Sequence, residues 1–203
     1  MDLYLNIFSS NITSLLSIYE DADKARLTKR GELLKKLFDE GTWTDEEFNS
    51  FSHYESHSEW ILMHSLFISA FSYFEIYMQV VAKKIELNST SKIKLKDIRG
   101  NGDLDCYRKY INYIGQIEFA SNEEKTWKKI IEFKTIRNSI VHKNGVIDKK
   151  VNLIKNYDLY YGPNEKMIRI KNLDFLKDFC KYTIDYMTKL TAEIEIKTAA
   201  NTM

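Results

Sequence analysis

The chain has 203 residues, a hydrophobic fraction of 44%, and 30 Lys and Arg against 29 Asp and Glu. This composition excludes an intrinsically disordered chain, and it excludes binding to nucleic acid through a global positive charge. With one proline and seven glycines, the chain lacks the turn residues of a many-stranded β fold. We therefore predict one all-α domain over residues 1–203.

The first 58 residues are predicted to form a helical extension. Apolar residues recur at helical spacing within 3–38, which predicts a long helix. Gly31 is expected to break or bend this helix, and Gly41 to end it. Thr44 to Glu47 reads T-D-E-E, a capping box that begins the next helix, with an irregularity expected within 50–58.

The most apolar stretch runs over 60–82 and contains His64 and Glu75. These polar residues favour a buried core helix over a membrane span, so we expect no membrane partner. Two distant cysteines, Cys106 and Cys180, are predicted to be reduced and buried. Together with the lack of a secretory pattern, they predict a cytoplasmic protein.

The rest of the chain alternates loops and helices. A loop at 88–91 and a turn at 100–102 precede a short predicted helix over 104–114. Ser121 to Glu124 reads S-N-E-E and opens a helix over 122–144, which ends at Asn144-Gly145. A small β-hairpin or loop is expected within 151–171, and Asn172 is expected to cap the last helix.

One helix carries a polar trio near its end. Phe133, Ile136 and Ile140 define its buried side, and His142 falls about 150° from the middle of that cluster on a helical wheel. Asn138 precedes His142 by four residues and shares its face, while Arg137 lies nearer the buried boundary.

This trio suits phosphodiester cleavage. An imidazole moves protons near neutral pH, a guanidinium neutralises charge on a phosphate, and an amide orients either group. RNA supplies its own nucleophile, the 2′-hydroxyl, so neither a metal nor another cofactor is expected. Because one histidine cannot easily act as both base and acid, we expect a homodimer that brings two copies of the trio together.

The segment E-F-K-T-I-R-N-S-I-V-H-K-N-G resembles the signature helix of HEPN domains, whose pattern is Arg, four to six residues, then His. In this chain the gap is four residues. The order of elements also agrees: the apolar helix L-F-I-S-A-F-S-Y-F-E-I-Y-M, then L-K-D-I-R-G-N-G-D-L-D-C-Y-R-K-Y-I, then the signature helix and a closing apolar helix. The resemblance covers about 60–195 and implies a four-helix bundle.

What the family implies is metal-independent RNA cleavage by a dimer in toxin–antitoxin or phage-defence settings. His142 would be the acid–base residue, Arg137 the phosphate stabiliser and Asn138 the orienting group. An antitoxin or regulatory protein is a further partner that such settings involve. Glu75 resembles an acidic residue of this family that fixes the arginine, although an exposed helix edge explains it equally well.

Other residues have weaker readings. His53 and His57, with His64 further on, lack the order and the third ligand of a zinc site and are predicted to be surface histidines. The segment 125–171 holds twelve Lys and Arg against four Asp and Glu. It is either a solvated face or an RNA-binding surface that includes Lys134 and Lys143. Nearby tyrosines (Tyr157, Tyr160 and Tyr161) either stack on bases or pack on the fold, and packing is favoured.

Three functions remain open. The first is a HEPN-type endoribonuclease. The second is a non-catalytic helical module that binds RNA or protein within a defence complex. The third is an enzyme silenced when a partner nucleotidyltransferase modifies a tyrosine such as Tyr160 or Tyr161.

Overall fold

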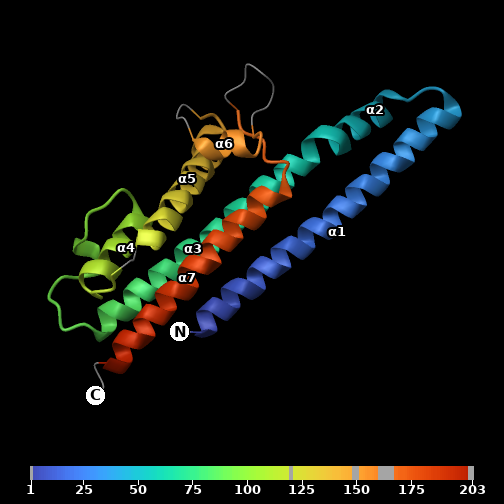
Figure 1. Cartoon of the computed structure of the whole chain (residues 1–203). Coiled ribbons are helices and arrows are strands. Elements are labelled where there is room, and N and C mark those ends of the chain that lie inside the picture. Colours follow the sequence, from blue (N-terminus) through green and yellow to red (C-terminus); the bar gives the residue numbers. More distant parts are fainter. Residues whose placement is uncertain (1, 119–120, 148–150, 160–166, 201–203) are drawn as a thin grey trace. The chain divides into compact units, whose positions relative to one another are not determined.

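The computed structural model describes residues 2–118, 121–147, 151–159 and 167–200. Its helices, in chain order (Figure 1), are α1 (Asp2–Glu40), α2 (Asp45–Ser52), α3 (Ser58–Asn88), α4 (Asp103–Tyr113), α5 (Ser121–Lys143), α6 (Asn152–Asn156) and α7 (Leu173–Ala200). A π-helical turn at His53–His57 and a 3-10 turn at Leu95–Asp97 complete the described elements. The described residues form no strand, so the predicted all-α class is confirmed.

Contacts within the chain divide it into two compact units. Unit 1 comprises Met1–Asn11, Ala70–Lys134 and Asp178–Met203, and unit 2 comprises Ile12–Ser69 and Thr135–Lys177. The long helices α1, α3, α5 and α7 each contribute residues to both units. Each unit buries its own set of apolar side chains. The four-helix bundle implied by the resemblance stays a prediction.

In unit 1, α3 and α7 run parallel to each other. Phe71 stacks on Phe179 with ring centroids 5.4 Å apart. Further along both helices, the Tyr77 hydroxyl lies 2.6 Å from the Thr191 hydroxyl and donates to the Met187 carbonyl at 3.3 Å. Residue numbers rise along both helices from one contact to the next, which shows that the helices are parallel. The two hydroxyls are hydrogen-bonded to each other inside the core.

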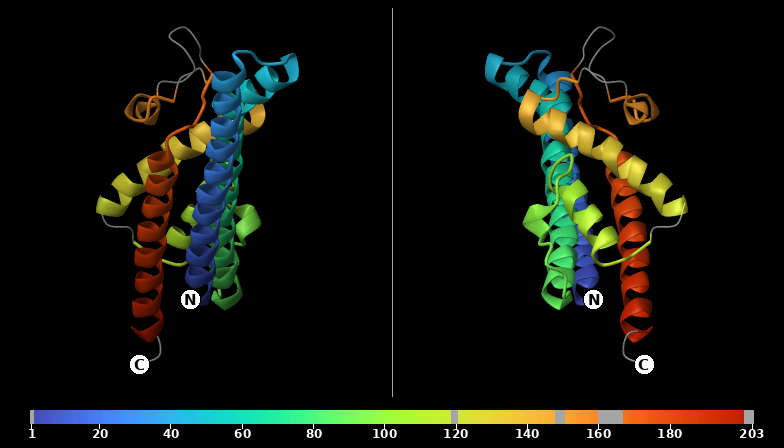
Figure 2. Two further views of the ribbon diagram at one scale, coloured as in Figure 1. Left: turned by 90° about the vertical axis from the view of Figure 1, so that its right-hand side faces the viewer. Right: turned by 90° about the vertical axis from the view of Figure 1, so that its left-hand side faces the viewer.

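The unit 1 parts of α5 and α4 pack against α7. Trp127 lies 5.4 Å from Tyr186, and Phe133 lies 5.3 Å from Phe179, so α5 runs antiparallel to α7. The Arg108 guanidinium of α4 lies over the Trp127 ring at 4.7 Å and donates to the Tyr186 hydroxyl at 3.2 Å. Figure 2 shows α4 beside the C-terminal half of α3.

In unit 2, α1 and α2 form an antiparallel pair. Gly41, at φ 75°, ends α1 as predicted, and its N–H donates to the Leu37 carbonyl. The Trp43 indole then donates to the Leu33 carbonyl at 2.9 Å, which fixes the connection. Gly31 does not break α1, so the predicted break was wrong. A glycine inside a helix costs about 1 kcal/mol, which the long flanking helix tolerates.

The start of α2 follows the predicted pattern. Thr44 accepts a hydrogen bond from the Glu47 N–H, and the Glu47 carboxylate accepts one from the Thr44 N–H at 2.9 Å. The irregularity expected within 50–58 is the π-helical turn His53–His57. A π-helical turn accommodates one extra residue in an otherwise helical run.

The segment Met167–Ile170 of unit 2 joins three parts of that unit. The Ile168 N–H donates to the Gly145 carbonyl, and the Arg169 N–H donates to the Leu159 carbonyl. The Ile170 N–H donates to Nε2 of His64 on α3 at 3.3 Å. A single antiparallel bridge pairs Val146 with Met167. This segment therefore fixes the end of α5 and the start of α3 to the same short stretch of backbone.

The insertion within 151–171 differs in part from the prediction. Residues 152–156 form the helix α6 rather than an extended segment, because Leu153 and Ile154 are buried by one helical turn. The expected hairpin turn at Gly162-Pro163-Asn164 lies outside the described residues. Asn172 caps α7 as predicted, since its side-chain oxygen accepts from the Asp174 N–H at 2.8 Å.

Candidate functional site

The C-terminal end of α5 carries the predicted trio. Asn144 (φ 50°) and Gly145 (φ 81°) adopt left-handed conformations directly after the helix. The Gly145 N–H donates to the Ser139 carbonyl at 2.9 Å, and the Val146 N–H donates to the Lys143 carbonyl. This is the helix ending that the Asn-Gly pair predicts, and it satisfies carbonyls that would otherwise be unpaired.

The trio differs in exposure from residue to residue. His142 is exposed, whereas Arg137 and Asn138 are half-buried. Phe133 and Ile136 are buried as predicted, and Ile140 is half-buried. The imidazole therefore lies on the side of α5 away from its apolar stripe, in contact with solvent.

Arg137 and Asn138 are in direct contact. Nη1 of Arg137 donates to Oδ1 of Asn138 at 3.1 Å. This bond restricts the guanidinium to one side of α5. Since Asn138 and His142 are four residues apart on a helix, the bond also holds the guanidinium near the face that carries the imidazole.

The other predicted site residues have different surroundings. Lys143 is exposed in the last turn of α5. Lys134, one turn before the trio, donates to the Asn101 carbonyl at 3.1 Å in unit 1 and thereby holds the loop before α4. Its role in RNA binding stays a prediction.

Glu75 is a half-buried residue of α3 in unit 1. It lies near Tyr107 of α4: burial chiefly, followed by the charge of Asp103 and, more weakly, that of Glu75, raises the pKa of the Tyr107 hydroxyl. Arg137 belongs to unit 2. The predicted pairing of Glu75 with Arg137 therefore stays a prediction.

The histidines of the N-terminal half fall into two classes. His53 and His57 are exposed in the π-helical turn, as predicted. His64 is 8% exposed, so its prediction as a surface histidine was wrong. Its ring lies 5.2 Å from Trp60 and accepts the Ile170 N–H. Among the described residues, no three His, Cys, Asp or Glu side chains are grouped so that they could hold a metal ion.

The surroundings of both cysteines and of Tyr157 are explained by packing and hydrogen bonding. Both thiols are free of disulfides; Cys180 is buried, and burial raises its pKa to about 12. Cys106 is half-buried rather than buried, and its thiol donates to the Ile98 carbonyl at 3.5 Å. Tyr157 packs edge-on against Phe175 at 5.4 Å, as favoured. Tyr160 and Tyr161 lie outside the described residues.

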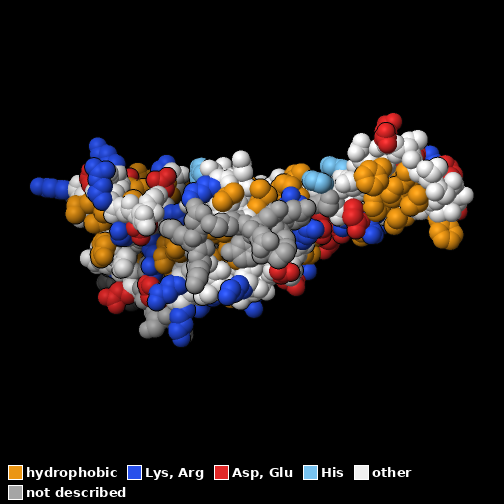
Figure 3. All heavy atoms as spheres, turned by 90° about the horizontal axis from the view of Figure 1, so that it is seen from above, with side chains coloured by type: hydrophobic (Ala, Val, Ile, Leu, Met, Phe, Trp, Pro, Cys, Tyr) orange, Lys and Arg blue, Asp and Glu red, His pale blue; other side chains and the backbone are white. Residues whose placement is uncertain are grey.

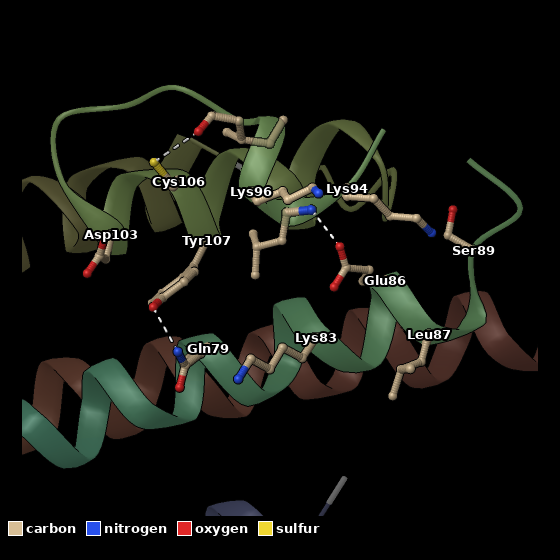
Figure 4. A pocket seen from close by; sticks show the side chains of 12 residues that line it. Gln79, Lys83, Glu86, Leu87, Ser89, Lys94, Lys96, Asp103, Cys106 and Tyr107 are labelled. Atoms are coloured by element: carbon tan, nitrogen blue, oxygen red, sulfur yellow. Dashed lines mark hydrogen bonds between the residues drawn. The ribbon is translucent and has the colours of Figure 1, made fainter. Parts of the chain in front are cut away.

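A pocket in unit 1 was not predicted. It has a volume of about 740 Å³ and lies between α3, the 3-10 turn and α4 (Figure 4). Three lysines line it: Lys83, Lys94 and Lys96. The sequence signal was the alternation S-K-I-K-L-K at 91–96, which places successive lysines on one side of an extended segment.

The run Asp45–Asn88 is long and apolar enough to cross a membrane by length and composition. Half of its most apolar window is buried against other parts of the protein, as in a core helix. This feature alone is weak evidence for a membrane span.

Comparison with known proteins adds no relative. Neither a protein-family model, nor a curated protein, nor a solved structure matches the chain.

Proposed function

We propose that this chain is a metal-independent endoribonuclease of the HEPN type, which cleaves RNA as a homodimer in a toxin–antitoxin or phage-defence setting. The observation that carries the proposal is the end of α5, where an exposed His142 shares a helix face with Asn138, and Asn138 binds Arg137. The sequence R-N-S-I-V-H and its placement in the last two turns of a helix support the same assignment.

The proposed reaction uses the RNA as its own nucleophile. The imidazole of one His142 accepts the proton of a 2′-hydroxyl, whose oxygen attacks the adjacent phosphorus. The bond from phosphorus to the 5′-oxygen breaks, and the imidazolium of the second protomer's copy of this residue donates a proton to that oxygen. The products are a 2′,3′-cyclic phosphate and a 5′-hydroxyl.

Arg137 would act on the phosphate. Its guanidinium neutralises the charge that builds on the non-bridging oxygens as the new bond forms, a role worth several kcal/mol in other enzymes. Asn138 accepts one N–H of this group and thereby orients it. Lys143 would add a sequence-independent contact to the RNA backbone.

The test is RNA cleavage by purified protein in EDTA, with the product ends analysed and the dimer measured by sedimentation. The proposal expects cleavage that persists in EDTA, leaves cyclic phosphate ends and is lost in His142→Ala and Arg137→Ala. His53→Ala is the matched control, because His53 is also exposed and lies outside the proposed site. Activity that needs a divalent metal, or that survives His142→Ala, would refute the proposal.

A second candidate is a non-catalytic module that binds RNA or protein in a defence complex. Exposed aromatic side chains favour it: Phe38 is 91% exposed and Phe48 is 59% exposed. Figure 3 shows hydrophobic side chains gathered over the connection between α1 and α2. Exposed aromatic groups of this kind are common at sites that bind other proteins. A folded, dimeric wild type that cleaves no RNA would favour this candidate.

A further inference from the structure

The pocket of unit 1 has three walls. Gln79, Lys83 and Glu86 lie at spacings of four and three on one face of α3. Asp103 and Tyr107 lie on one face of α4. The third wall is the segment 89–98, here termed the strap. A volume of about 740 Å³ is within the range of small-ligand sites.

The strap is held in place by its own hydrogen bonds. The Leu95 N–H donates to the Glu86 carboxylate of α3 at 2.6 Å, a bond that Figure 4 shows across the pocket. The Lys94 N–H donates to the Asp97 carboxylate at 2.8 Å. The Tyr110 hydroxyl of α4 donates to the Ile93 carbonyl at 3.2 Å. The backbone that carries the lysines is therefore fixed to both helices before any ligand binds.

The three lysines of the pocket form no ion pair within the part of the chain that the structure describes. Lys83, Lys94 and Lys96 are exposed, and none forms an ion pair with a described residue. Lys109 on α4 provides a contrast, since Asp105 neutralises it at 2.9 Å. Figure 4 shows Lys83 coming from α3 and the other two from the strap. Unneutralised ammonium groups from two elements at one cavity are suited to a phosphate.

The remaining walls suit the rest of a nucleotide. Asp103 is exposed at the start of α4, and a carboxylate commonly accepts hydrogen bonds from ribose hydroxyls. The Tyr107 hydroxyl accepts from the Gln79 amide at 3.1 Å, which fixes the ring in the wall. Leu87, Leu95 and Ile98 add apolar surface for a base. The lysines would therefore contact the phosphate, the carboxylate the ribose, and the apolar wall the base.

We infer that this pocket binds a phosphorylated ribonucleotide, either a free nucleotide or one unit of an RNA strand. The site goes beyond the proposed cleavage function. It lies wholly in unit 1, and none of the residues proposed for catalysis lines it. A protein without ribonuclease activity would still have this site.

The test is calorimetric titration of the full chain carrying His142→Ala, so that cleavage cannot consume a ligand. The probes are adenosine 5′-triphosphate, a ten-nucleotide single-stranded RNA and the DNA of the same sequence, at low and high salt. At least one ribonucleotide probe is expected to bind with a Kd below about 0.1 mM at low salt, and more weakly at high salt.

Substitutions distinguish binding at this pocket from nonspecific attraction to positive charge elsewhere on the protein. Lys94→Ala with Lys96→Ala, and Lys83→Ala separately, are expected to weaken binding by about tenfold each. The matched control is Lys35→Ala with Lys181→Ala, two exposed lysines with no ion pair among the described residues. This control is expected to change the Kd by less than about twofold. Asp103→Asn is expected to reduce the preference for RNA over DNA.

The two sources of ligand give different results. Tight triphosphate binding with weak RNA binding identifies a free nucleotide, and the reverse order identifies an RNA strand. The inference is overturned if no ribonucleotide probe binds with a Kd below about 0.1 mM at low salt, or if the control pair loses as much affinity as the pocket variants. The pocket variants lie in unit 1 and the proposed catalytic residues in unit 2, so RNA binding that the pocket substitutions do not weaken overturns this inference and leaves the proposed cleavage untouched. Failure of cleavage with intact nucleotide binding leaves this site untouched.

Discussion

Two histidines of unit 2 differ in burial and in hydrogen bonding, although both lie near the segment Met167–Ile170. His64 on α3 is buried and accepts the Ile170 N–H, whereas His142 on α5 is exposed in the last helical turn. The segment Met167–Ile170 contacts both neighbourhoods, since Ile168 binds the Gly145 carbonyl just after α5. One histidine is therefore part of the framework, and the other is available to a substrate.

Burial determines whether a histidine ring can be protonated. Burial chiefly, with the charge of Arg169 in addition, lowers the pKa of His64 to about 4, so its ring is neutral at physiological pH. Its Nε2 must stay unprotonated to accept the Ile170 N–H. An acid–base catalyst must exchange protons freely with its surroundings, and burial of this kind prevents that. The comparison thus separates a histidine that serves structure from one suited to catalysis.

The largest expected effect is on catalysis. We predict that His142→Ala lowers RNA cleavage by about 10²–10⁴-fold, the usual contribution of a general acid or base. Because the side chain is exposed, the thermal midpoint should stay within about 1 °C of wild type. The matched variant, His64→Ala, should lower the thermal midpoint by several degrees, because it leaves the Ile170 N–H without its partner. Equal losses of stability in the two variants would contradict the distinction between a structural His64 and a catalytic His142.

The second effect is on stability in acid. The pKa of His64 is about 6.5 when unfolded and about 4 when folded, so between these values the unfolded chain binds more protons. The free energy of unfolding should fall as the pH drops from 6.5 to 4, by up to about 3 kcal/mol from this residue. His64→Gln keeps an acceptor for the Ile170 N–H but does not titrate.

The measurement is urea unfolding at several pH values between 7.5 and 4, for wild type and His64→Gln. Carboxylates that titrate near pH 4 affect both proteins, so the difference between the curves isolates His64. Parallel curves for wild type and His64→Gln would mean that this ring is not the source of the acid sensitivity.

Local signals predicted much of the fold, and long-range contacts account for what was missed. The ends of α1 and α5 and the starts of α2 and α7 follow from capping residues within four positions, as at Thr44 and Asn172. The hydrogen-bond partner of His64 is Ile170, 106 residues away, and no pattern near His64 signals this bond. The five-residue helix α6 is too short for a periodic pattern to reveal.

The candidate sites show the same division. The trio of α5 was found because Arg137, Asn138 and His142 lie within six consecutive residues of one helix. The pocket of unit 1 was missed because α3, the strap and α4 each contribute a wall to it. The bond from Lys134 to Asn101 spans 33 residues and was equally invisible. Spacing along a helix predicts which residues share a face, but not what that face contacts.

The third effect concerns the link between α5 and Met167–Ile170. Gly145 has φ 81°, and an added Cβ would lie 3.1 Å from the Ile168 carbonyl oxygen. We predict that Gly145→Ala lowers the free energy of unfolding by about 1–2 kcal/mol, the cost of the left-handed conformation with a side chain. Gly31→Ala is the control: it lies in open space within α1 and should stabilise by about 0.5–1 kcal/mol. Urea unfolding measures both, and a neutral Gly145→Ala would show that this ending of α5 relaxes at no cost.

The smallest effect would show whether the surroundings of His142 bind RNA. Lys143 follows His142 and is exposed, so Lys143→Ala should remove one phosphate contact and raise the Kd for single-stranded RNA by about threefold. The slope of log affinity against log salt should fall by about one for the same reason. Lys177→Ala is the control, since Lys177 is exposed on α7 of the same unit and lies outside the proposed site. Fluorescence anisotropy in the His142→Ala background measures both Kd values. Equal weakening in both variants would indicate diffuse attraction to unit 2. Weakening confined to Lys143→Ala would place the RNA backbone beside the exposed histidine and not beside the buried one.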